Sequence, residues 1–209
     1  VKLLQLMKQQ GISRLVYLSS GGTVYGNPES NPVNEEARLN PISSYGAVKV
    51  AIEKFIEISR YSGEINPLIL RPSNPYGVRQ GHQGTQGLIS TILSNVINAR
   101  PTVIYGDGSV IRDYIYVKDL ADFVGQALVS DSAGIYNVGS GVGYSVNQVI
   151  GLIEGVTKSP VDTEYVDKRG FDVKEVVLDC QRAKSELGWE ATTELSEGIG
   201  IYYDWLKDQ

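Results

Sequence analysis

The sequence predicts an α/β protein in which a parallel sheet is joined to a smaller α+β lobe. A short apolar strand, a long amphipathic helix and a second apolar strand follow one another early in the chain, and this order is typical of a βαβ unit. In the second half, short strands and helices alternate without a uniform βα rhythm, which favours an α+β lobe. The composition is that of a globular protein, since 42% of the 209 residues are hydrophobic and 21% are charged.

The first elements follow from local patterns. Apolar residues at helical spacing before Gly11 predict the end of a helix. Residues 14–20, RLVYLSS, form a β-rich run that ends at two glycines, as expected of a buried parallel strand. Residues 43–63 begin with serine N-cap candidates, repeat apolar residues at helical spacing and end at glycine, which predicts a helix. Residues 67–77, PLILRPSNPYG, predict a second buried strand that is closed by a turn containing proline.

The remaining elements alternate between helices and strands. A polar loop rich in Gly and Gln follows the second strand, and its composition argues against regular structure. We expect strands at 102–105, 114–117 and 135–138, and helices ending near residue 99 and spanning 119–129, 145–157, 180–189 and 195–208. The charged residues of the long helix, between 49 and 60, predict a solvated or interface face.

Composition excludes several classes of function. Lys and Arg number 19 and Asp and Glu 24, so the net charge of −5 argues against a nucleic-acid partner. Cys180 and His82 are the only residues of their types, too few for a disulfide framework or a zinc site, so we expect no metal. No apolar run approaches the roughly 20 residues of a membrane span, and the first residues do not resemble a signal peptide. We therefore expect a cytoplasmic protein without a membrane partner.

Tyr45 and Lys49 lie four residues apart at the start of the long helix, so their side chains share one face. A cation beside a phenol favours the phenolate and lowers the phenol's pKa from about 10, which suits a general base. The same spacing also occurs by chance on solvated helix faces. Its position after SSGGTVYG, where Ser19, Ser20 and Thr23 offer hydroxyls, favours the catalytic interpretation.

Five segments in a fixed order carry a family resemblance. These are LSSGGTVYG, SSYGAVK, LRPSNPYG, GDGSVIRDYIYVKDLA and RGFD. The chain resembles the extended short-chain dehydrogenase/reductase family, and within it the NAD-dependent nucleotide-sugar epimerases and dehydratases, above all the UDP-glucose 4-epimerases. The resemblance implies the C-terminal part of a doubly wound, Rossmann-like parallel sheet beside a substrate-binding lobe. It further implies a Rossmann remnant at 1–77, with 110–130 packing back on it, and a region at 78–209 that is mainly a nucleotide-sugar-binding lobe.

The resemblance also assigns roles to single residues. Tyr45 matches the tyrosine that takes the proton of the sugar 4-hydroxyl while the C4 hydride passes to NAD+, and Lys49 matches the lysine that binds the nicotinamide ribose. The implied cofactor contacts are Ser19, Ser20, Tyr45, Lys49 and Pro72. The implied substrate contacts are Asn74 and Arg112 at the phosphates, Tyr105 at the base, Arg169 and Asp172 at the phosphates and ribose, and Val176 at the sugar C2 substituent. The small side chain of Val176 leaves room there for N-acetylhexosamines.

Two departures from the family pattern matter. Gly21 occupies the position of a catalytic Ser or Thr, so Thr23 is the nearest substitute and Ser20 the next. The neighbouring Gly22 and Thr23 replace the Asp-Glu pair of the 4,6-dehydratases, which disfavours dehydration. The glycine turn that receives the cofactor pyrophosphate is also missing, together with the strand and helix that carry it in the family. The run VGSGVG at 138–143 does not replace it, since it lacks the G-x-G-x-x-G spacing. We therefore expect the C-terminal two thirds of such an enzyme.

The predicted function is that of an isomerase of carbohydrate metabolism, an NAD-dependent UDP-hexose 4-epimerase, and the chain by itself is expected to be inactive. The alternatives are a dehydratase, reductase or decarboxylase of the same family, or a nucleotide-sugar-binding remnant without catalysis. The resemblance implies a homodimer through the helix at 43–62, with Val50, Ile52, Phe55, Ile56 and Ile58 in the core and the interface.

Overall fold

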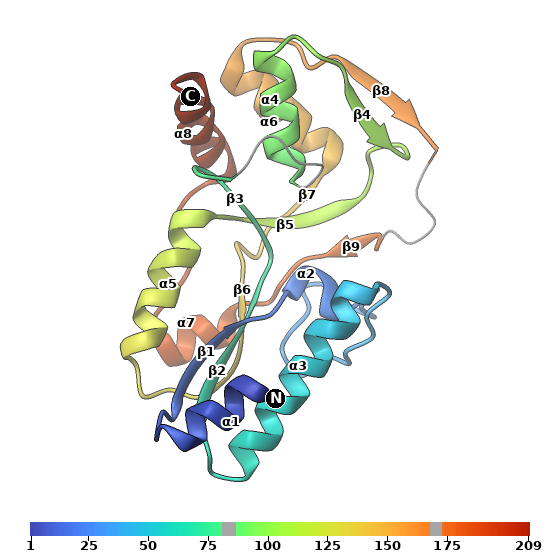
Figure 1. Ribbon diagram of the computed structural model, residues 1–209. Helices are drawn as coiled ribbons and strands as arrows, with labels where there is room; N and C mark the ends of the chain where they lie inside the picture. The colour runs from blue at the N-terminus through green and yellow to red at the C-terminus, as the bar shows by residue number, and fades with distance from the viewer. Residues whose placement is uncertain (81–86, 168–172) are drawn as a thin grey trace.

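The computed structural model describes residues 1–80, 87–167 and 173–209. Two groups of elements are joined through a central region (Figure 1). One group surrounds a three-stranded parallel sheet near the N-terminus, and the other gathers three helices and a two-stranded ribbon near the C-terminus. No helix among these residues is long and apolar enough to cross a membrane.

The first sheet has the strand order β1-β2-β6 and is parallel throughout. Its strands are β1 (Arg14–Leu18), β2 (Asn66–Pro72) and β6 (Gly134–Val138), and its helices are α1 (Lys2–Gln9), α3 (Ser44–Tyr61), α5 (Val117–Val129) and α7 (Gln181–Leu187). Helices α1 and α3 pack on the face that carries Ile69, and α5 and α7 pack on the face that carries Leu68 and Leu70. Because side chains alternate along a strand, β2 is apolar on both faces, as the sequence predicts for a buried parallel strand.

Strand β2 passes at Ser73 into a second sheet. That sheet contains β3 (Asn74–Tyr76), β5 (Ile111–Tyr116), β7 (Gly143–Ser145) and β9 (Glu175–Val176). Strand β5 pairs with β3 and β9 in parallel and with β7 in antiparallel orientation. The expected turn after β2 is thus a continuation of the strand into the central region, and residues far apart in the sequence meet there.

The C-terminal group is built on helix packing. It contains α4 (Leu88–Ile97), α6 (Val146–Thr157) and α8 (Leu195–Lys207), and the parallel ribbon of β4 (Thr102–Tyr105) and β8 (Thr163–Val166). Helix α6 begins with a capping box, in which Ser145 accepts from the Gln148 N–H and the Gln148 side chain accepts from the Ser145 N–H. The three helices share one core, which includes Ile92, Ile153 and Tyr202.

The α/β class with parallel strands is confirmed. Helix α5 packs on β1 and β5. Strand β6 and α7 also pack in the first group. The two groups therefore interleave in the sequence, because a parallel sheet takes strands from distant parts of the chain.

Candidate functional site

Tyr45 and Lys49 lie at the N-terminal end of α3. Ser43 caps this helix, because its Oγ accepts from the Gly46 N–H at 3.1 Å, as the serine pattern predicts. Tyr45 is 55% exposed, and the Lys49 Nζ lies 5.5 Å from the centre of its ring. The helical spacing thus places a phenol and an ammonium on one face, with the phenol open to solvent.

Lys49 is held at the carboxyl end of β1. Its Nζ donates to the carbonyl oxygen of Leu18 at 2.8 Å and lies 5.2 Å from the centre of the Tyr17 ring. An ammonium carries three N–H donors, so this anchor leaves capacity for further acceptors. Ligands of open parallel sheets bind outside the carboxyl ends of the strands, which is where this lysine lies.

The hydroxyl candidates lie on α2 (Gly21–Val24) and just before it. Ser19 is buried and its Oγ donates to Glu53, so this hydroxyl is already engaged inside the protein. The Thr23 Oγ1 is half-buried and lies 3.5 Å from the carbonyl oxygen of Ser20, which precedes the helix. The two glycines before Thr23 thus start a helical turn.

Asn74 joins this region to the second sheet. Its Nδ2 donates to the carbonyl oxygen of Asp113 at 2.8 Å, and its Oδ1 would lie 3.6 Å from a Cβ atom at Gly22. A larger side chain at Gly22 would therefore contact the Asn74 amide. The structure brings Asn74 next to α2, although the two segments are about fifty residues apart in the sequence.

Strand β5 positions Arg112 beside Asn74. Asn74 pairs with Tyr114 across β3 and β5, and Arg112 pairs with Val176 across β5 and β9. The Arg112 guanidinium is partly buried and donates to the Ile111 carbonyl oxygen at 2.8 Å. A planar guanidinium and an amide from adjacent positions of one sheet suit the recognition of a phosphate or diphosphate.

Asp113 stabilises this arrangement, and sequence reasoning missed it. Its Oδ1 accepts from the N–H and the hydroxyl of Ser140, each at 2.9 Å, and its Oδ2 accepts from the N–H groups of Gly141 and Leu178 at 3.1 and 3.2 Å. Burial raises the pKa of this carboxyl, and these hydrogen bonds act in the opposite direction. No local pattern could reveal it, because its partners lie 27 to 65 residues away.

Several predicted residues lie elsewhere. Tyr105 is 43% exposed on β4, in the ribbon of the C-terminal group (Figure 1). Val176 is only 2% exposed and packs in a hydrophobic cluster with Val24 and Leu178. Pro72 is buried at the end of β2. Arg169, Asp172 and His82 lie outside the described residues.

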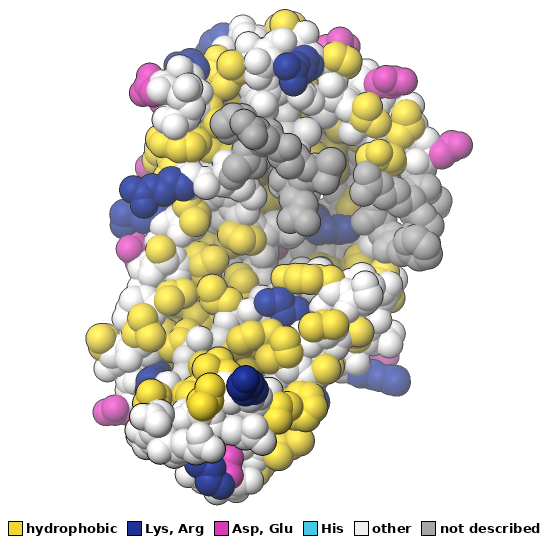
Figure 2. Space-filling view, viewed as in Figure 1, with side chains coloured by type: hydrophobic (Ala, Val, Ile, Leu, Met, Phe, Trp, Pro, Cys, Tyr) yellow, Lys and Arg dark blue, Asp and Glu magenta, His cyan; other side chains and the backbone are white. Residues whose placement is uncertain are grey.

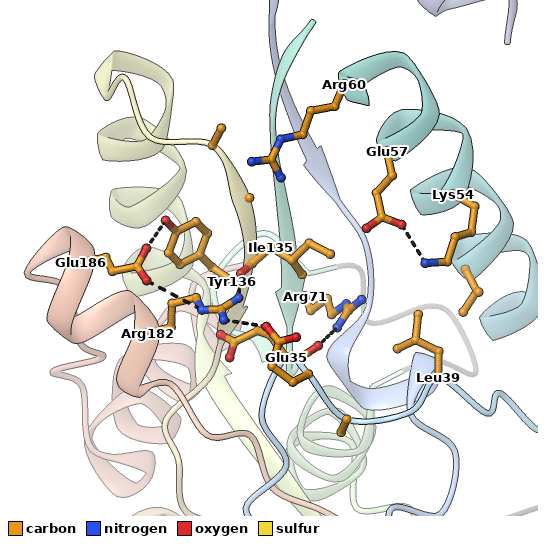
Figure 3. Close-up of a pocket in the computed structure, with 15 residues that line it drawn as sticks. Glu35, Leu39, Lys54, Glu57, Arg60, Arg71, Ile135, Tyr136, Arg182 and Glu186 are labelled. Carbon is orange, nitrogen blue, oxygen red and sulfur yellow. Dashed lines mark hydrogen bonds and ion pairs between the residues drawn. The ribbon is translucent and has the colours of Figure 1, made fainter. Parts of the chain in front are cut away.

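A cavity of about 710 Å³ lies away from Tyr45, between α3, β6 and α7 (Figure 3). Charged side chains line it, and several of them pair with one another: Lys54 with Glu57 at 2.7 Å, and Arg182 with Glu186 at 3.8 Å. Since cations and anions neutralise each other there, the cavity shows no preference for a charged ligand.

The residues present fit one half of a dinucleotide. Lys49 offers N–H donors at the carboxyl end of β1, and the Ser73 Oγ, at the carboxyl end of β2, is buried without a partner among the described residues. These groups and the exposed phenol of Tyr45 suit a ribose and an amide. The pyrophosphate half has no matching glycine turn in this sequence.

Comparisons with known proteins identify relatives of the chain. The model of the NAD dependent epimerase/dehydratase family matches residues 1–139. A UDP-glucose 4-epimerase of Mycolicibacterium smegmatis is 33% identical over 210 residues, which cover 100% of this chain and 67% of that protein.

Solved structures are similar over the same extent. The UDP-glucose 4-epimerase of Thermotoga maritima, solved with UDP-glucose, gives a TM-score of 0.94 at 31% sequence identity. The matched region is 99% of this chain and 67% of the Thermotoga chain. The UDP-glucose 4-epimerase of Thermus thermophilus in complex with NAD gives a TM-score of 0.92 at 31% sequence identity. The matched region is 98% of this chain and 67% of the Thermus chain. The chain thus spans about two thirds of the length of each of these proteins.

Proposed function

Since the chain belongs to the NAD dependent epimerase/dehydratase family, we propose that it carries the catalytic and nucleotide-sugar-binding part of a UDP-hexose 4-epimerase. The observation that carries this proposal is the group formed by Tyr45, Lys49 and the Leu18 carbonyl at the carboxyl end of β1. Asn74 and Arg112 lie across from it on the second sheet, where they suit a diphosphate.

Tyr45 acts as the general base and acid in this proposal. Its exposed phenol, once deprotonated, accepts the proton of the sugar 4-hydroxyl and later returns it. The Lys49 ammonium lies 5.5 Å from the centre of the Tyr45 ring, and its anchor on Leu18 keeps it on the same helix face. Thr23 shares this proton through its hydroxyl, with Ser20 as the second candidate.

In this proposal the nicotinamide ribose end of NAD is held by five residues: Ser19, Ser20, Tyr45, Lys49 and Pro72. The cofactor of this family is NAD, as expected from the resemblance. When bound, it supplies an acceptor for the C4 hydride that later gives the hydride back. Since the Ser19 hydroxyl donates to Glu53, we assign Ser19 a backbone contact only.

The nucleotide-sugar contacts follow the same arrangement. Asn74 and Arg112 bind the diphosphate, since both are held by β5. Tyr105 packs against the base, and Arg169 and Asp172 bind the phosphates and the ribose. We include the N-acetylhexosamine analogues among the substrates on the size of Val176 alone, which is smaller than the aromatic residue that restricts the family site to glucose and galactose. Its side chain packs in the buried cluster with Val24 and Leu178, so the added room depends on that cluster.

Epimerisation is favoured over dehydration by α2. Elimination of water from a sugar needs a carboxylic acid and a base near C5 and C6, and the residues available in α2 are glycines, Thr23 and Val24. A sibling that oxidises, reduces or decarboxylates the sugar remains the second candidate, because it uses the same tyrosine and lysine.

We also propose a homodimer through α3. Its outer face exposes Val48, Phe55, Ile58 and Tyr61. Hydrophobic side chains gather over α1, β1 and α3 in Figure 2, and an apolar helix face of this kind suits a helix bundle between two copies. Sedimentation over a range of concentrations tests this assembly, and a monomer at every concentration contradicts it.

Calorimetric titration with UDP and with NAD+ tests the binding part of the proposal. Tight binding of UDP with weak binding of NAD+ is expected, because the nucleotide-sugar residues are present and the glycine turn for the pyrophosphate is not. Turnover is then measured with UDP-glucose and excess NAD+, followed by separation of the two UDP-hexoses.

UDP-galactose without net NADH supports epimerisation, and accumulation of NADH indicates the oxidising sibling. Tyr45→Phe is expected to lower turnover by about 10²- to 10⁴-fold without loss of UDP binding. The matched control is Tyr61→Phe on the same helix, whose side chain is 87% exposed. A chain that binds neither UDP nor NAD+ contradicts the proposal.

A further inference from the structure

Glu53 and Arg71 form an ion pair inside the protein. The Arg71 Nη2 lies 2.7 Å from the Glu53 Oε2, and the Arg71 Nε lies 3.2 Å from the Glu53 Oε1. The two side chains are only 1 to 2% exposed. This two-point contact uses the planar geometry of the guanidinium, so it fixes orientation as well as distance.

Such a pair needs a reason beyond stability. Removing two charges from water costs several kcal/mol per ion, and apolar replacements of similar volume are often equally stable or more stable. A buried pair that is retained can instead specify one arrangement of the elements that carry it. The elements joined by this pair are therefore informative.

The pair joins three segments that carry the candidate site. Glu53 lies on α3, four residues after Lys49 and eight after Tyr45, so the three side chains share one helix face. The Ser19 hydroxyl, directly after β1, donates to Glu53. Arg71 lies on β2, three residues before Asn74.

The contacts continue toward the second sheet. The Arg71 Nη1 donates to the Tyr25 hydroxyl at 2.9 Å and to the Glu35 carbonyl oxygen at 3.1 Å, the latter shown in Figure 3. The Tyr25 hydroxyl donates to the Asn137 Oδ1 at 2.7 Å. The Asn137 Nδ2 donates to the carbonyl oxygens of Val33 and Asp179, at 2.9 and 3.1 Å. Asp179 follows the segment that pairs with β5 at Arg112.

Arg71 and Tyr25, two members of this series of contacts, each keep one protonation state. Burial, the largest single cause, would lower the pKa of Arg71, but its hydrogen bonds and charge interactions with Glu53 and Tyr25 together raise it. Burial raises the pKa of Tyr25 to about 12, against the opposing effect of Arg71. Arg71 therefore stays charged and Tyr25 stays a neutral donor over the range in which enzymes work.

We propose that Glu53 and Arg71 are positioning residues, which hold Tyr45 and Lys49 of α3 in register with the ends of β1 and β2 for proton transfer at the sugar. This inference rests on the proposed function and deepens it. The buried pair touches no reacting atom and acts only through the helix and strands it joins.

The test separates positioning from stability. In the double variant Glu53→Leu/Arg71→Met, both charges are replaced by apolar groups, so thermal stability is expected to return to within a few degrees of the parent. The kcat is expected to fall about 10²-fold, the loss typical of misplacement by about 1 Å, while KM stays within about threefold. A double variant with parental stability and parental kcat overturns the proposal.

Two further variants keep the test decisive if the double variant does not fold. Arg71→Lys keeps the charge but loses the planar two-point contact, so the same separate loss of kcat is expected. Lys54→Gln on α3 removes an exposed charge that pairs with Glu57 and is expected to leave both constants unchanged. Parental kcat in Arg71→Lys overturns the proposal in that case.

A second readout does not depend on turnover. Since the chain by itself is expected to be inactive, hydrogen exchange tests the positioning role also where turnover is absent, and the UDP titration tests the proposed function separately. In Arg71→Lys, the amides of residues 44–50 are expected to exchange about tenfold faster, while those of α6 and α8 keep the parental rate. Unchanged exchange at residues 44–50 overturns the proposal.

Discussion

Gly46 of α3 lies directly against the carbonyl oxygen of Thr23. A Cβ atom at Gly46 would lie 2.8 Å from this oxygen and 2.9 Å from the Cβ of Pro41. The N-terminal turn of α3 can therefore approach α2 this closely only because residue 46 has no side chain. Since Tyr45 precedes Gly46, this contact sets the distance between the predicted base and the hydroxyl of Thr23.

Gly46→Ala is expected to destabilise the protein by about 1–3 kcal/mol, because the added methyl group must displace backbone atoms. Urea unfolding measures this change. Gly125→Ala on α5 is the matched control, since a Cβ atom there meets nothing within 4 Å. The control is expected to raise stability by about 0.5–1 kcal/mol, the usual gain of alanine over glycine in a helix. Equal effects of the two substitutions would contradict the close contact.

Asp113→Asn is expected to lower stability by about 3 kcal/mol in urea unfolding. Each carboxylate oxygen of Asp113 accepts two hydrogen bonds, so an amide in either orientation turns an NH2 group toward N–H donors and leaves buried groups unsatisfied. Asp122→Asn on α5 is the control, because Asp122 forms an exposed pair with Lys118 and is expected to change stability by under about 1 kcal/mol. A loss of that small size at Asp113 would contradict its role.

Much of the first sheet could be predicted from the sequence, because local signals determine it. The strand at Arg14–Leu18 and the helix at Ser44–Tyr61 match their predicted ranges to within two residues, and Ser43 caps the helix as expected. These elements depend on periodicity, on capping and on glycine, which act within a few residues. The continuation of β2 into β3 escaped prediction, since Pro75 resembles a turn signal when its pairing with β5 is unknown.

The candidate site was predictable only where family motifs carry it. The prediction of a solvated or interface face between residues 49 and 60 does not hold for Glu53, which is completely buried within the chain. Its partner Arg71 lies 18 residues away on β2, so no helical period could reveal the pair. The same holds for Asp113, whose carboxylate accepts from two distant segments, at residues 140–141 and at Leu178. Buried charges depend on tertiary partners, and a sequence pattern alone does not contain them.

Glu35→Gln is expected to raise stability at neutral pH, and the gain is expected to shrink as the pH falls. Burial raises the pKa of the Glu35 carboxyl above its ordinary value, so folding favours its protonated form. The ionised carboxyl therefore lowers the free energy of unfolding as the pH rises from the ordinary pKa of a glutamate to the raised pKa of Glu35. The full loss of stability is present above the raised pKa. Glutamine avoids the penalty, and its amide oxygen can still accept from the Asn137 N–H, which Glu35 binds at 2.8 Å.

Melting temperatures of the parent and Glu35→Gln across the acidic and neutral range measure this difference. Glu29→Gln is the control, because Glu29 is an exposed carboxylate of the same loop. A difference between parent and Glu35→Gln that is constant with pH, or that grows toward acid, would contradict the direction of the shift.

Cys180 is expected to react slowly with a thiol reagent until the protein unfolds. Burial raises the pKa of this thiol, and its Sγ accepts from the Gly139 N–H at 3.2 Å. Since the thiolate is the reactive form, labelling in native buffer is expected to be at least about 100-fold slower than in denaturant. The chain has one cysteine, so the labelling rate reports this site alone. Equal rates in both conditions would show that the contact between Gly139 and Cys180 opens readily and would contradict the burial of this thiol.

Lys49→Met separates the chemistry of the site from its binding of the nucleotide. Methionine keeps much of the side-chain length but removes the charge and the hydrogen bond to Leu18, so turnover is expected to fall by about 10²- to 10⁴-fold. UDP binding is expected to persist, because Asn74 and Arg112 are held by β5. Lys54→Met on the same helix removes an exposed partner of Glu57 and is expected to leave both properties unchanged. Parental turnover in Lys49→Met would show that this lysine takes no part in proton transfer. A loss of UDP binding together with turnover would indicate a structural role instead.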